Sequence, residues 1–381
     1  MLERKELQEI ASNYSNVTIG VLGSHSAEEV GIAARIFGFP TVIICQKGRD
    51  DLYAKHNRHL FDTFITLDKF SDMLKDNVQE RLRELNTVFI PNRSFSVYVG
   101  YDGIENSFKV PLYGNRFLLR TEERTESKNQ YWLLEKAGIR IPKKFSSQDE
   151  IDRLVIVKVQ QKHRPNERAF FYCSSSEEFE KRSNELLGKD MITKNDLEKA
   201  RIEEFVLGQK FNANFHGWIT KEIGDFDFVG FDERKQTNLH GILSLPAKEQ
   251  ISVDVPIVNE EVGHSGLTMR ESQKPLVYEA AEKFRKVCEK EFVPGIFGLF
   301  ALQGALAYDN NKLEFFVFDV SPRVPGAPAV GPTSPEMRRL TLKYGNLLSQ
   351  FNMPKIESPM DLSMLEIKYA IKNKRLDDVV T

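Results

Sequence analysis

Residues 297–323 read FGLFALQGALAYDNNKLEFFVFDVSPR. Two apolar runs, 300–308 and 313–320, flank the polar turn Asp309-Asn310-Asn311. Apolar runs that meet at an Asp/Asn cluster predict two strands joined in a hairpin. The first strand places the amide of Gln303 among apolar neighbours, and the second ends with Asp319, which is followed four residues later by Arg323.

Asp319 stands in an otherwise apolar strand, and a buried charge is costly unless it is paired or holds a metal ion. The residues alone leave two partners open. Arg323 would make a structural ion pair with it, which is the simpler interpretation of this segment taken by itself. A Mg²⁺ ion carrying nucleotide phosphates is the other, because this ion prefers hard oxygen ligands.

The composition sets broad limits on the class of protein. A chain of 381 residues is long enough for two or three domains. Its 27 Phe predict a phenylalanine-rich core. Lys and Arg number 53 against 55 Asp and Glu, and a net charge of −2 gives no argument for a nucleic acid or an anionic membrane as partner.

The cysteines and the N-terminus point to a reducing compartment. Cys45, Cys173 and Cys288 are too widely spaced for a disulfide framework or a zinc site, so we expect them to be small buried apolar residues. The charged first twelve residues lack the apolar stretch of a signal peptide, and no apolar run approaches ~20 residues. We therefore expect a cytoplasmic protein with no membrane span.

The first hundred residues alternate strands with helices. Strands are expected at 17–22, 41–45, 63–67 and 87–91, with helices at 27–37 and 73–85. This alternation predicts a parallel α/β sheet. Polar segments follow the first and fourth strands, at 23–26 and 91–96. Ligands bind beyond the carboxyl ends of such strands, so these segments are expected to share a small-molecule site.

The segment Gly23-Ser24-His25-Ser26 precedes a helix, with Ser26 as the expected N-cap. Free amides at a helix N-terminus suit a phosphate group. A plain capped strand–helix turn explains the same residues, and the motif alone does not separate the two.

The remaining chain contains helices and mostly antiparallel strands. We expect a long helical region at 117–137 that stops at Gly138, and then a new domain. The predicted strands are 154–159, 169–174, 201–209, 211–219, 226–231 and 241–245. Predicted helices are 177–187, a turn at 196–200 capped by Asn195, 275–289, and several from 335 onward.

This order of elements resembles the ATP-grasp fold: a strand ending in Lys158, a polar loop, a strand, a helix, an acidic strand and the hairpin. The chain as a whole resembles more closely the archaeal formate-dependent FAICAR synthetases. These enzymes use ATP and formate to formylate 5-aminoimidazole-4-carboxamide ribonucleotide (AICAR) in purine (IMP) biosynthesis. The resemblance rests on the segments 22–26, 48–49, 81–86, 104–106, 110–111, 114–116, 133–144, 155–158, 204–208, 246–250, 270–272 and 318–323.

The resemblance implies an architecture that combines α/β and α+β parts. A Rossmann-like parallel α/β domain at 1–115 would be followed by a helical connection at 116–145 and an ATP-grasp domain at 146–381. Self-association as a trimer or hexamer is likewise implied by resemblance only.

The family's site residues carry over position by position. AICAR would contact Ser24, His25, Ser94 and Asn238. ATP would contact Lys158 through its phosphates, and Glu203, Glu204 and Val206 at the adenine and ribose. Mg²⁺ or Mn²⁺ would lie at Gln303 and Asp319. Lys158 and Arg323 would be the catalytic cations, acting on formyl phosphate as the intermediate.

Three departures from the family pattern leave an alternative open. The loop 160–168, glycine-rich in the family, has no glycine and one proline here, although Lys162, His163, Arg164 and Arg168 remain. Gln303 stands where the family has a glutamate metal ligand, and Asp319 where it has a longer Glu. The alternative is a weakened or inactive paralogue that binds nucleotide and serves as a regulatory or assembly subunit.

Overall fold

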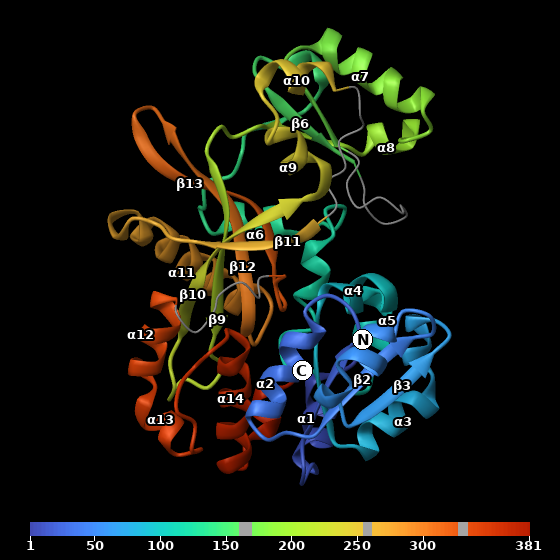
Figure 1. Ribbon diagram of the computed structural model, residues 1–381, viewed down its shortest axis with the longest axis vertical. Helices are drawn as coiled ribbons and strands as arrows, with labels where there is room; N and C mark the ends of the chain where they lie inside the picture. Colours follow the sequence, from blue (N-terminus) through green and yellow to red (C-terminus); the bar gives the residue numbers. More distant parts are fainter. Residues whose placement is uncertain (160–169, 254–260, 327–333) are drawn as a thin grey trace.

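The computed structural model describes residues 1–159, 170–253, 261–326 and 334–381. The N-terminal region is a four-stranded sheet of order β3-β2-β1-β4 (Figure 1). All of its neighbouring strands are parallel, so the predicted α/β sheet is confirmed. Its strands are β1 (Thr18–Leu22), β2 (Thr41–Gln46), β3 (Thr63–Leu67) and β4 (Thr87–Ile90).

Helices pack around this sheet because their apolar residues are buried against it. They are α1 (Arg4–Ser12), α2 (Ala27–Ile36), α3 (Asp76–Glu84), α4 (Arg93–Val99) and α5 (Tyr101–Asn106), with short helical turns η1 (Leu52–His56), η2 (Arg58–Leu60) and η3 (Phe70–Leu74). Ser26 precedes α2 as expected, but its side chain does not cap the helix. Its backbone is left-handed at φ 62°, and its hydroxyl donates instead to the Pro325 carbonyl at 3.1 Å.

The central sheet has five strands in the order β11-β10-β9-β12-β13. They are β9 (Gln209–Gly217), β10 (Phe226–Gln236), β11 (Glu261–Leu267), β12 (Gly298–Asp309) and β13 (Lys312–Ser321). The predicted hairpin is confirmed as β12 and β13. Asn310 and Asn311 both have positive φ, 48° and 64°, which is the two-residue turn that matches the twist of paired strands.

One face of the central sheet is packed against α11 (Lys274–Glu291), which is preceded by η6 (Glu271–Gln273). Phenylalanines fill the layer between them, and Phe215 stacks on Phe300 with ring centroids 5.3 Å apart. The phenylalanine-rich core is therefore confirmed. The opposite face of the sheet carries polar side chains, among them Asn212, Gln303 and Asp319.

A small antiparallel sheet of order β5-β8-β6-β7 forms the far end of the molecule. It comprises β5 (Lys144–Phe145), β6 (Val155–Lys158), β7 (Phe170–Cys173) and β8 (Arg201–Glu204), with η5 (Gln148–Glu150), α7 (Ser176–Gly188) and α8 (Lys194–Glu198). Ser175 caps α7 by accepting from the Glu178 amide. The cap of α8 is Thr193 and not Asn195, because Thr193 and Asp196 satisfy each other's backbone amides in a capping box.

Two predicted elements are wrong. The region 117–137 is not one helix but η4 (Leu119–Glu122), a loop, and α6 (Gln130–Lys136). Asn129 starts α6 by accepting from the amides of Tyr131 and Trp132. No strand forms at 241–245: residues 241–243 end α9 (Thr237–Leu243), 244–245 form a turn, and α10 (Ala247–Ser252) follows. Leu239 and Leu243 face the same cavity one helical turn apart, a spacing that a strand does not give.

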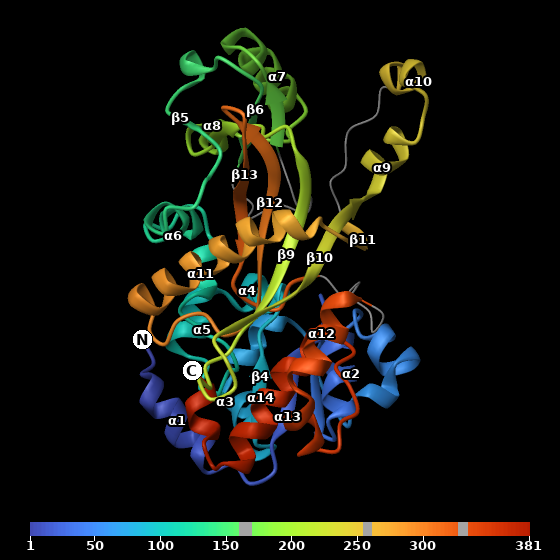
Figure 2. The ribbon, with the colours of Figure 1, turned by 90° about the vertical axis from the view of Figure 1, so that its left-hand side faces the viewer.

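The last helices return to the N-terminal region (Figure 2). They are α12 (Pro335–Lys343), α13 (Gly345–Ser349), α14 (Met360–Lys372) and η7 (Leu376–Val379), and α14 packs on α2. One apolar core contains residues of both segments. The boundaries 1–115, 116–145 and 146–381 stay a prediction. All three cysteines are buried and free of disulfides, as expected.

The α2–α14 contact encloses a carboxyl group that should respond to pH. Burial, and then the Asp361 carboxylate, raise the pKa of Glu29 to about 8, and one of its oxygens has no hydrogen-bond partner among the described residues. Because the folded pKa lies above the unfolded value, its stabilising contribution is complete below about pH 4.5 and is lost as pH rises through 8. We predict that Glu29→Gln raises the melting temperature at pH 9 by roughly a few degrees and changes it little at pH 5.

Thermal unfolding at both pH values measures this effect. Glu84→Gln, at an exposed position on α3, is the control and should change neither value. Equal effects of Glu29→Gln at pH 5 and pH 9 would contradict the assignment.

Candidate functional site

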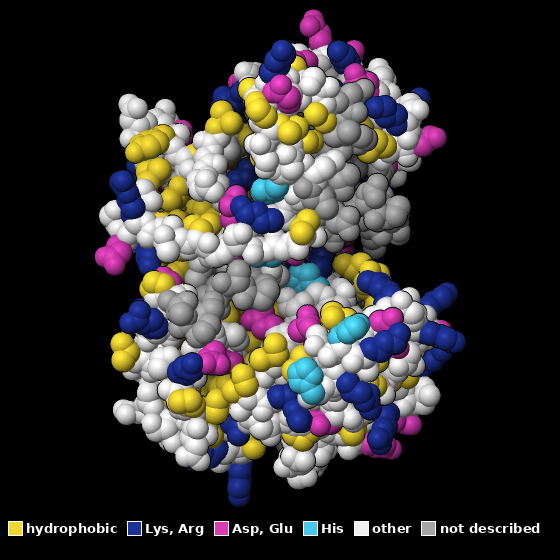
Figure 3. Space-filling view, in the orientation of Figure 1, with side chains coloured by type: hydrophobic (Ala, Val, Ile, Leu, Met, Phe, Trp, Pro, Cys, Tyr) yellow, Lys and Arg dark blue, Asp and Glu magenta, His cyan; other side chains and the backbone are white. Residues whose placement is uncertain are grey.

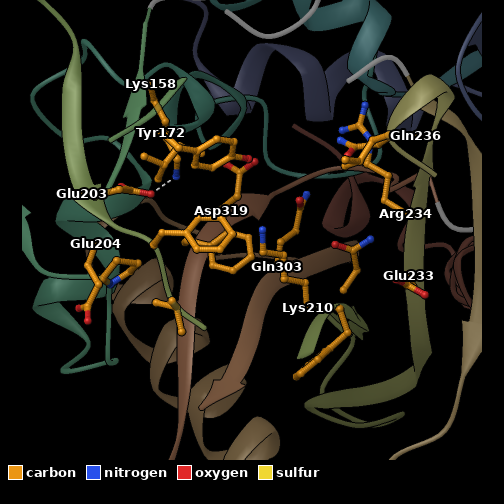
Figure 4. A pocket seen from close by; sticks show the side chains of 18 of the residues that line it. Lys158, Tyr172, Glu203, Glu204, Lys210, Glu233, Arg234, Gln236, Gln303 and Asp319 are labelled. Atoms are coloured by element: carbon orange, nitrogen blue, oxygen red, sulfur yellow. Dashed lines mark ion pairs between the residues drawn. The ribbon is translucent and has the colours of Figure 1, made fainter. Parts of the chain in front are cut away.

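A cavity of 310 Å³ lies between the small sheet and the central sheet. Cavities of this size are typical of small-molecule sites. Six residues singled out from the sequence line it together, and Figure 4 shows most of them around one space. They are Lys158, Glu203, Glu204, Val206, Gln303 and Asp319.

Lys158 and Glu203 form a buried ion pair at one wall of the cavity (Figure 4). Glu203 is only 1% exposed and also accepts from Arg201 at 2.8 Å. Burial alone would lower the pKa of Lys158, but the Glu203 carboxylate and Tyr131 together outweigh burial and raise the pKa above the usual value. Lys158 therefore presents a fixed positive charge to the cavity, which suits a phosphate.

Tyr131 holds Lys158 in this wall, and no sequence pattern singled it out. Its hydroxyl accepts from the Lys158 ammonium at 3.3 Å and donates to the Phe318 carbonyl at 3.2 Å. The Arg201 guanidinium lies 3.5 Å from the centre of its ring. The phenol thus ties the small sheet to β13, through contacts between residues far apart in the chain.

The segment from Glu204 to Gly208 leads the chain from the small sheet into β9. The Glu204 carboxylate accepts from the Lys143 amide at 3.3 Å and pairs with Arg153 at 3.4 Å. Val206 is buried against β12 and β13. A side chain at Gly208 would meet the Leu306 carbonyl at 2.2 Å, so glycine is required where this connection crosses β12.

A polar row runs across the opposite side of the central sheet from α11. The strand register aligns Asp232 with Asn212, Asn212 with Gln303, and Gln303 with Asp319. The amide nitrogen of Gln303 donates to the Ser321 hydroxyl at 3.2 Å. Both carboxylate oxygens of Asp232 are engaged, by Asn212 at 2.7 Å and by Asn214 at 2.6 Å.

Of the two partners left open for Asp319, Arg323 is wrong: the two side chains form no ion pair in the described part of the chain. Arg323 pairs with Glu122 at 3.0 Å, and Glu122 also holds Arg93 at 2.6 Å. Glu122 comes from η4, in the connection between the predicted domains, so its approach was not visible from local sequence. Asp319 acts electrostatically on both arginines without a direct bond to either.

Three of the residues expected to contact AICAR, Ser24, His25 and Ser94, lie at the carboxyl edge of the N-terminal sheet. β1 and β4 are neighbours, and the Asn92 side chain donates to the Leu22 carbonyl at 2.9 Å while it caps α4. This bond brings the segments 23–26 and 91–96 together, as predicted. Ser94 is buried in the first turn of α4, and His25 is half-buried in the turn after β1.

A histidine from β11 meets this edge, and sequence reasoning missed it. Hydrogen bonds to Asp232 and Glu261 outweigh burial and raise the pKa of His264 to about 9, whereas burial and Arg323 lower the pKa of His25 to about 3. Both imidazoles lie against Gly326, where a Cβ would be 2.8 Å from His25 Nε2 and 3.1 Å from His264 Nε2. The edge thus holds one neutral and one charged imidazole.

Asn238 lies on a different element from the other residues expected to contact AICAR. Asn238 lies on α9, whose Leu239 and His240 line the cavity between the sheets. Ser24, His25 and Ser94 lie on the N-terminal region instead. The loop 160–168, with its four titratable side chains, falls outside the described residues.

Basic and acidic side chains are interspersed over the face seen in Figure 3. That face carries no broad basic surface among the described residues, in line with the balanced composition. No helix in the described ranges is long and apolar enough to cross a membrane. No group of three His, Cys, Asp or Glu side chains suited to a metal ion occurs in the described ranges.

Comparisons with known proteins agree with this architecture. The model "Protein of unknown function (DUF1246)" matches residues 19–145, and "Domain of unknown function (DUF1297)" matches 178–381. A crystal structure of the IMP biosynthesis protein PurP from Thermococcus kodakaraensis aligns with a TM-score of 0.68 at 21% identity, covering 95% of this chain and 100% of the other. N5-carboxyaminoimidazole synthetase from Staphylococcus aureus aligns at 0.52 with 13% identity, covering 82% and 71%.

The small antiparallel sheet facing the central sheet across a cavity, together with these likenesses, defines an ATP-grasp fold. A relative from Methanopyrus kandleri, named 5-formaminoimidazole-4-carboxamide-1-(beta)-D-ribofuranosyl 5'-monophosphate synthetase, is 38% identical over 332 residues, which is 87% of this chain and 89% of the relative. The chain belongs to this family of FAICAR synthetases.

The buried pair at the cavity wall gives a direct test of the site's construction. Replacing Glu203 with Gln leaves Lys158 and Arg201 without a carboxylate, and uncompensated buried charge typically costs about 3 kcal/mol or more. Glu204→Gln, at the next residue, removes a partly exposed contact and should cost under about 1 kcal/mol. Urea unfolding of the two variants measures the difference; equal losses would show that Glu203 is not the anchor.

Proposed function

We propose that the protein is an ATP-dependent carbon–nitrogen ligase that converts AICAR to FAICAR with formate. The observation that carries this proposal is the cavity between the two sheets, where Lys158, the connection 204–208 and Asp319 converge. Membership in the FAICAR synthetase family supplies the reaction class. The reaction belongs to purine (IMP) biosynthesis.

The proposed chemistry has two steps. A formate oxygen attacks the terminal phosphorus of ATP, which gives formyl phosphate and releases ADP. The AICAR amine then attacks the formyl carbon, phosphate leaves, and the amine loses one proton. Cationic side chains lower the barrier because they neutralise the oxygens of the phosphoryl group as it moves.

Each side chain at the cavity has a role that fits its geometry. Lys158 is held by Glu203 and Tyr131 with its ammonium at the cavity wall, where it binds phosphate oxygens. Backbone groups near Val206 read the adenine edge, and Glu203 and Glu204 flank the base and ribose. Arg323 acts on the transferred phosphoryl group.

AICAR binds at the edge of the N-terminal sheet in this proposal. Ser24 and His25 precede α2, whose first amides favour a phosphate, and Ser94 stands beside them on α4. Asn238 approaches from α9. Mg²⁺ or Mn²⁺ would accompany ATP in turnover, where Gln303 offers a neutral oxygen and Asp319 a carboxylate.

The test is a coupled assay with purified protein, ATP, Mg²⁺, formate and AICAR. We expect ADP release and formylated product only when all substrates are present. ATP should also raise the melting temperature, because a ligand that binds only the folded state stabilises it. A rise in melting temperature with ATP but no formylated product would instead favour a paralogue that binds nucleotide without turnover. Gln303, which stands where the family has a glutamate, is the observation that favours this alternative.

The AICAR assignment has its own test. Substituting His25→Ala or Ser94→Ala removes polar groups from the N-terminal edge only, so we predict AICAR affinity about tenfold weaker and ATP affinity nearly unchanged. Calorimetric titration of each ligand measures both constants. Wild-type AICAR affinity in both variants would reject this edge as the AICAR site.

A further inference from the structure

The donor set near Asp319 fits a divalent cation poorly. Mg²⁺ prefers several oxygen ligands with negative charge among them. Asp232 shares the polar row, but its two oxygens are taken by Asn212, Asn214 and His264. Gln303 supplies a neutral oxygen, so Asp319 is left as the one charged ligand of this row.

Three guanidinium groups lie close enough to that carboxylate to interact with it electrostatically. They belong to Arg93, Arg124 and Arg323. Glu122 bridges Arg93 and Arg323, which fixes both side chains and neutralises one charge. Three guanidinium groups against two carboxylates leave this cluster with a net positive charge, which attracts anions and repels a dication.

The cluster also has hydrogen-bond donors without partners. Arg323 is 9% exposed, and its other nitrogens bond to Glu122 and to the Val324 carbonyl, yet its Nε has no acceptor among the described residues. The Nε of Arg124 is also buried without an acceptor in the described part of the chain, and Arg124 lines the cavity. Buried donors that lack acceptors are expensive, so an anion with several oxygens is the ligand that would satisfy them.

The position of the three arginines between the cavity and the N-terminal edge indicates which anion they bind. Arg124 and Asp319 face the cavity with Lys158 and Glu203, whereas Arg93 and Arg323 act electrostatically on His25 at the N-terminal edge. The arginines therefore lie between the two predicted ligand sites. In a nucleotide bound at the cavity, the terminal phosphates are the groups that reach furthest toward the second site.

We propose that Arg124 and Arg323 bind the terminal phosphates of the nucleotide directly. Their positive charges neutralise the phosphate oxygens, as a metal ion held by two carboxylates would otherwise do. This inference rests on the proposed nucleotide site. It makes binding of a nucleoside triphosphate nearly independent of Mg²⁺. Guanidinium groups are suited to this because their planar N–H donors match phosphate oxygens in pairs.

Calorimetry on the full chain tests the inference, with ATP and adenosine as probes in Mg²⁺ and in EDTA. In the wild-type protein we expect the ATP dissociation constant to change by less than about threefold when Mg²⁺ is removed. A gain of tenfold or more with Mg²⁺ would overturn the inference while leaving the nucleotide site intact. Absence of ATP binding in both buffers would reject the nucleotide site and this inference with it.

Variants separate the arginines from other contributions. Arg124→Gln should weaken ATP binding in EDTA by about tenfold or more and leave adenosine binding unchanged. Arg182→Gln, an exposed residue on α7, is the matched control and should alter neither. Wild-type ATP affinity in Arg124→Gln would overturn the inference.

A variant with a glutamate at position 303 tests the inference from the other direction, by adding a carboxylate that could hold Mg²⁺. Gln303→Glu adds a second carboxylate beside Asp319, so ATP binding in this variant should become at least about tenfold tighter with Mg²⁺ than without it. Its melting temperature is measured alongside. A destabilised protein with no Mg²⁺-dependent gain would show that position 303 is structural and that no cation site can be rebuilt there, which overturns the metal-replacement argument.

Discussion

Buried charge must be compensated, and the region between the N-terminal sheet and the other two sheets is built on that constraint. Glu203 is shared by Lys158 and Arg201, and Glu122 is shared by Arg93 and Arg323. Each carboxylate joins cations from distant parts of the chain. Removing one would strand two positive charges, so the elements that carry them are fixed relative to one another.

The same constraint explains how the cavity keeps a positive character. Glu203 and Glu122 are each neutralised by ion pairs. Lys158 still presents its ammonium at the cavity wall, and the Nε of Arg124 has no acceptor among the described residues. Asp319 is the acidic group of the hairpin that is not held by a direct ion pair in the described chain. An anionic ligand is therefore the natural occupant, as expected for an ATP-grasp protein in the FAICAR synthetase family.

The His264 network shows how the central sheet contributes to the second site. Asp232 is fully buried, so it needs the donors of Asn212, Asn214 and His264. The hydrogen bond to Asp232 fixes the His264 ring against Gly326, which the His25 ring also contacts. The long reach of β10 and β11 thus places a charged imidazole at the edge of a sheet that belongs to another part of the chain.

Most local elements could be predicted from the sequence alone. Alternating strands and helices gave the parallel sheet, and the Asp-Asn-Asn turn gave the hairpin, because period and turn chemistry are local properties. The resemblance also placed Lys158, Glu203, Glu204, Val206, Gln303 and Asp319 near one another, and they line one cavity. The pairing of charges is set by the tertiary structure. Arg323 meets Glu122 and not Asp319, because a carboxylate far away in the chain reaches the same buried guanidinium and no local pattern records it. Residues 241–243 end α9 instead of forming a strand, and the helical spacing turns Leu239 and Leu243 toward one cavity.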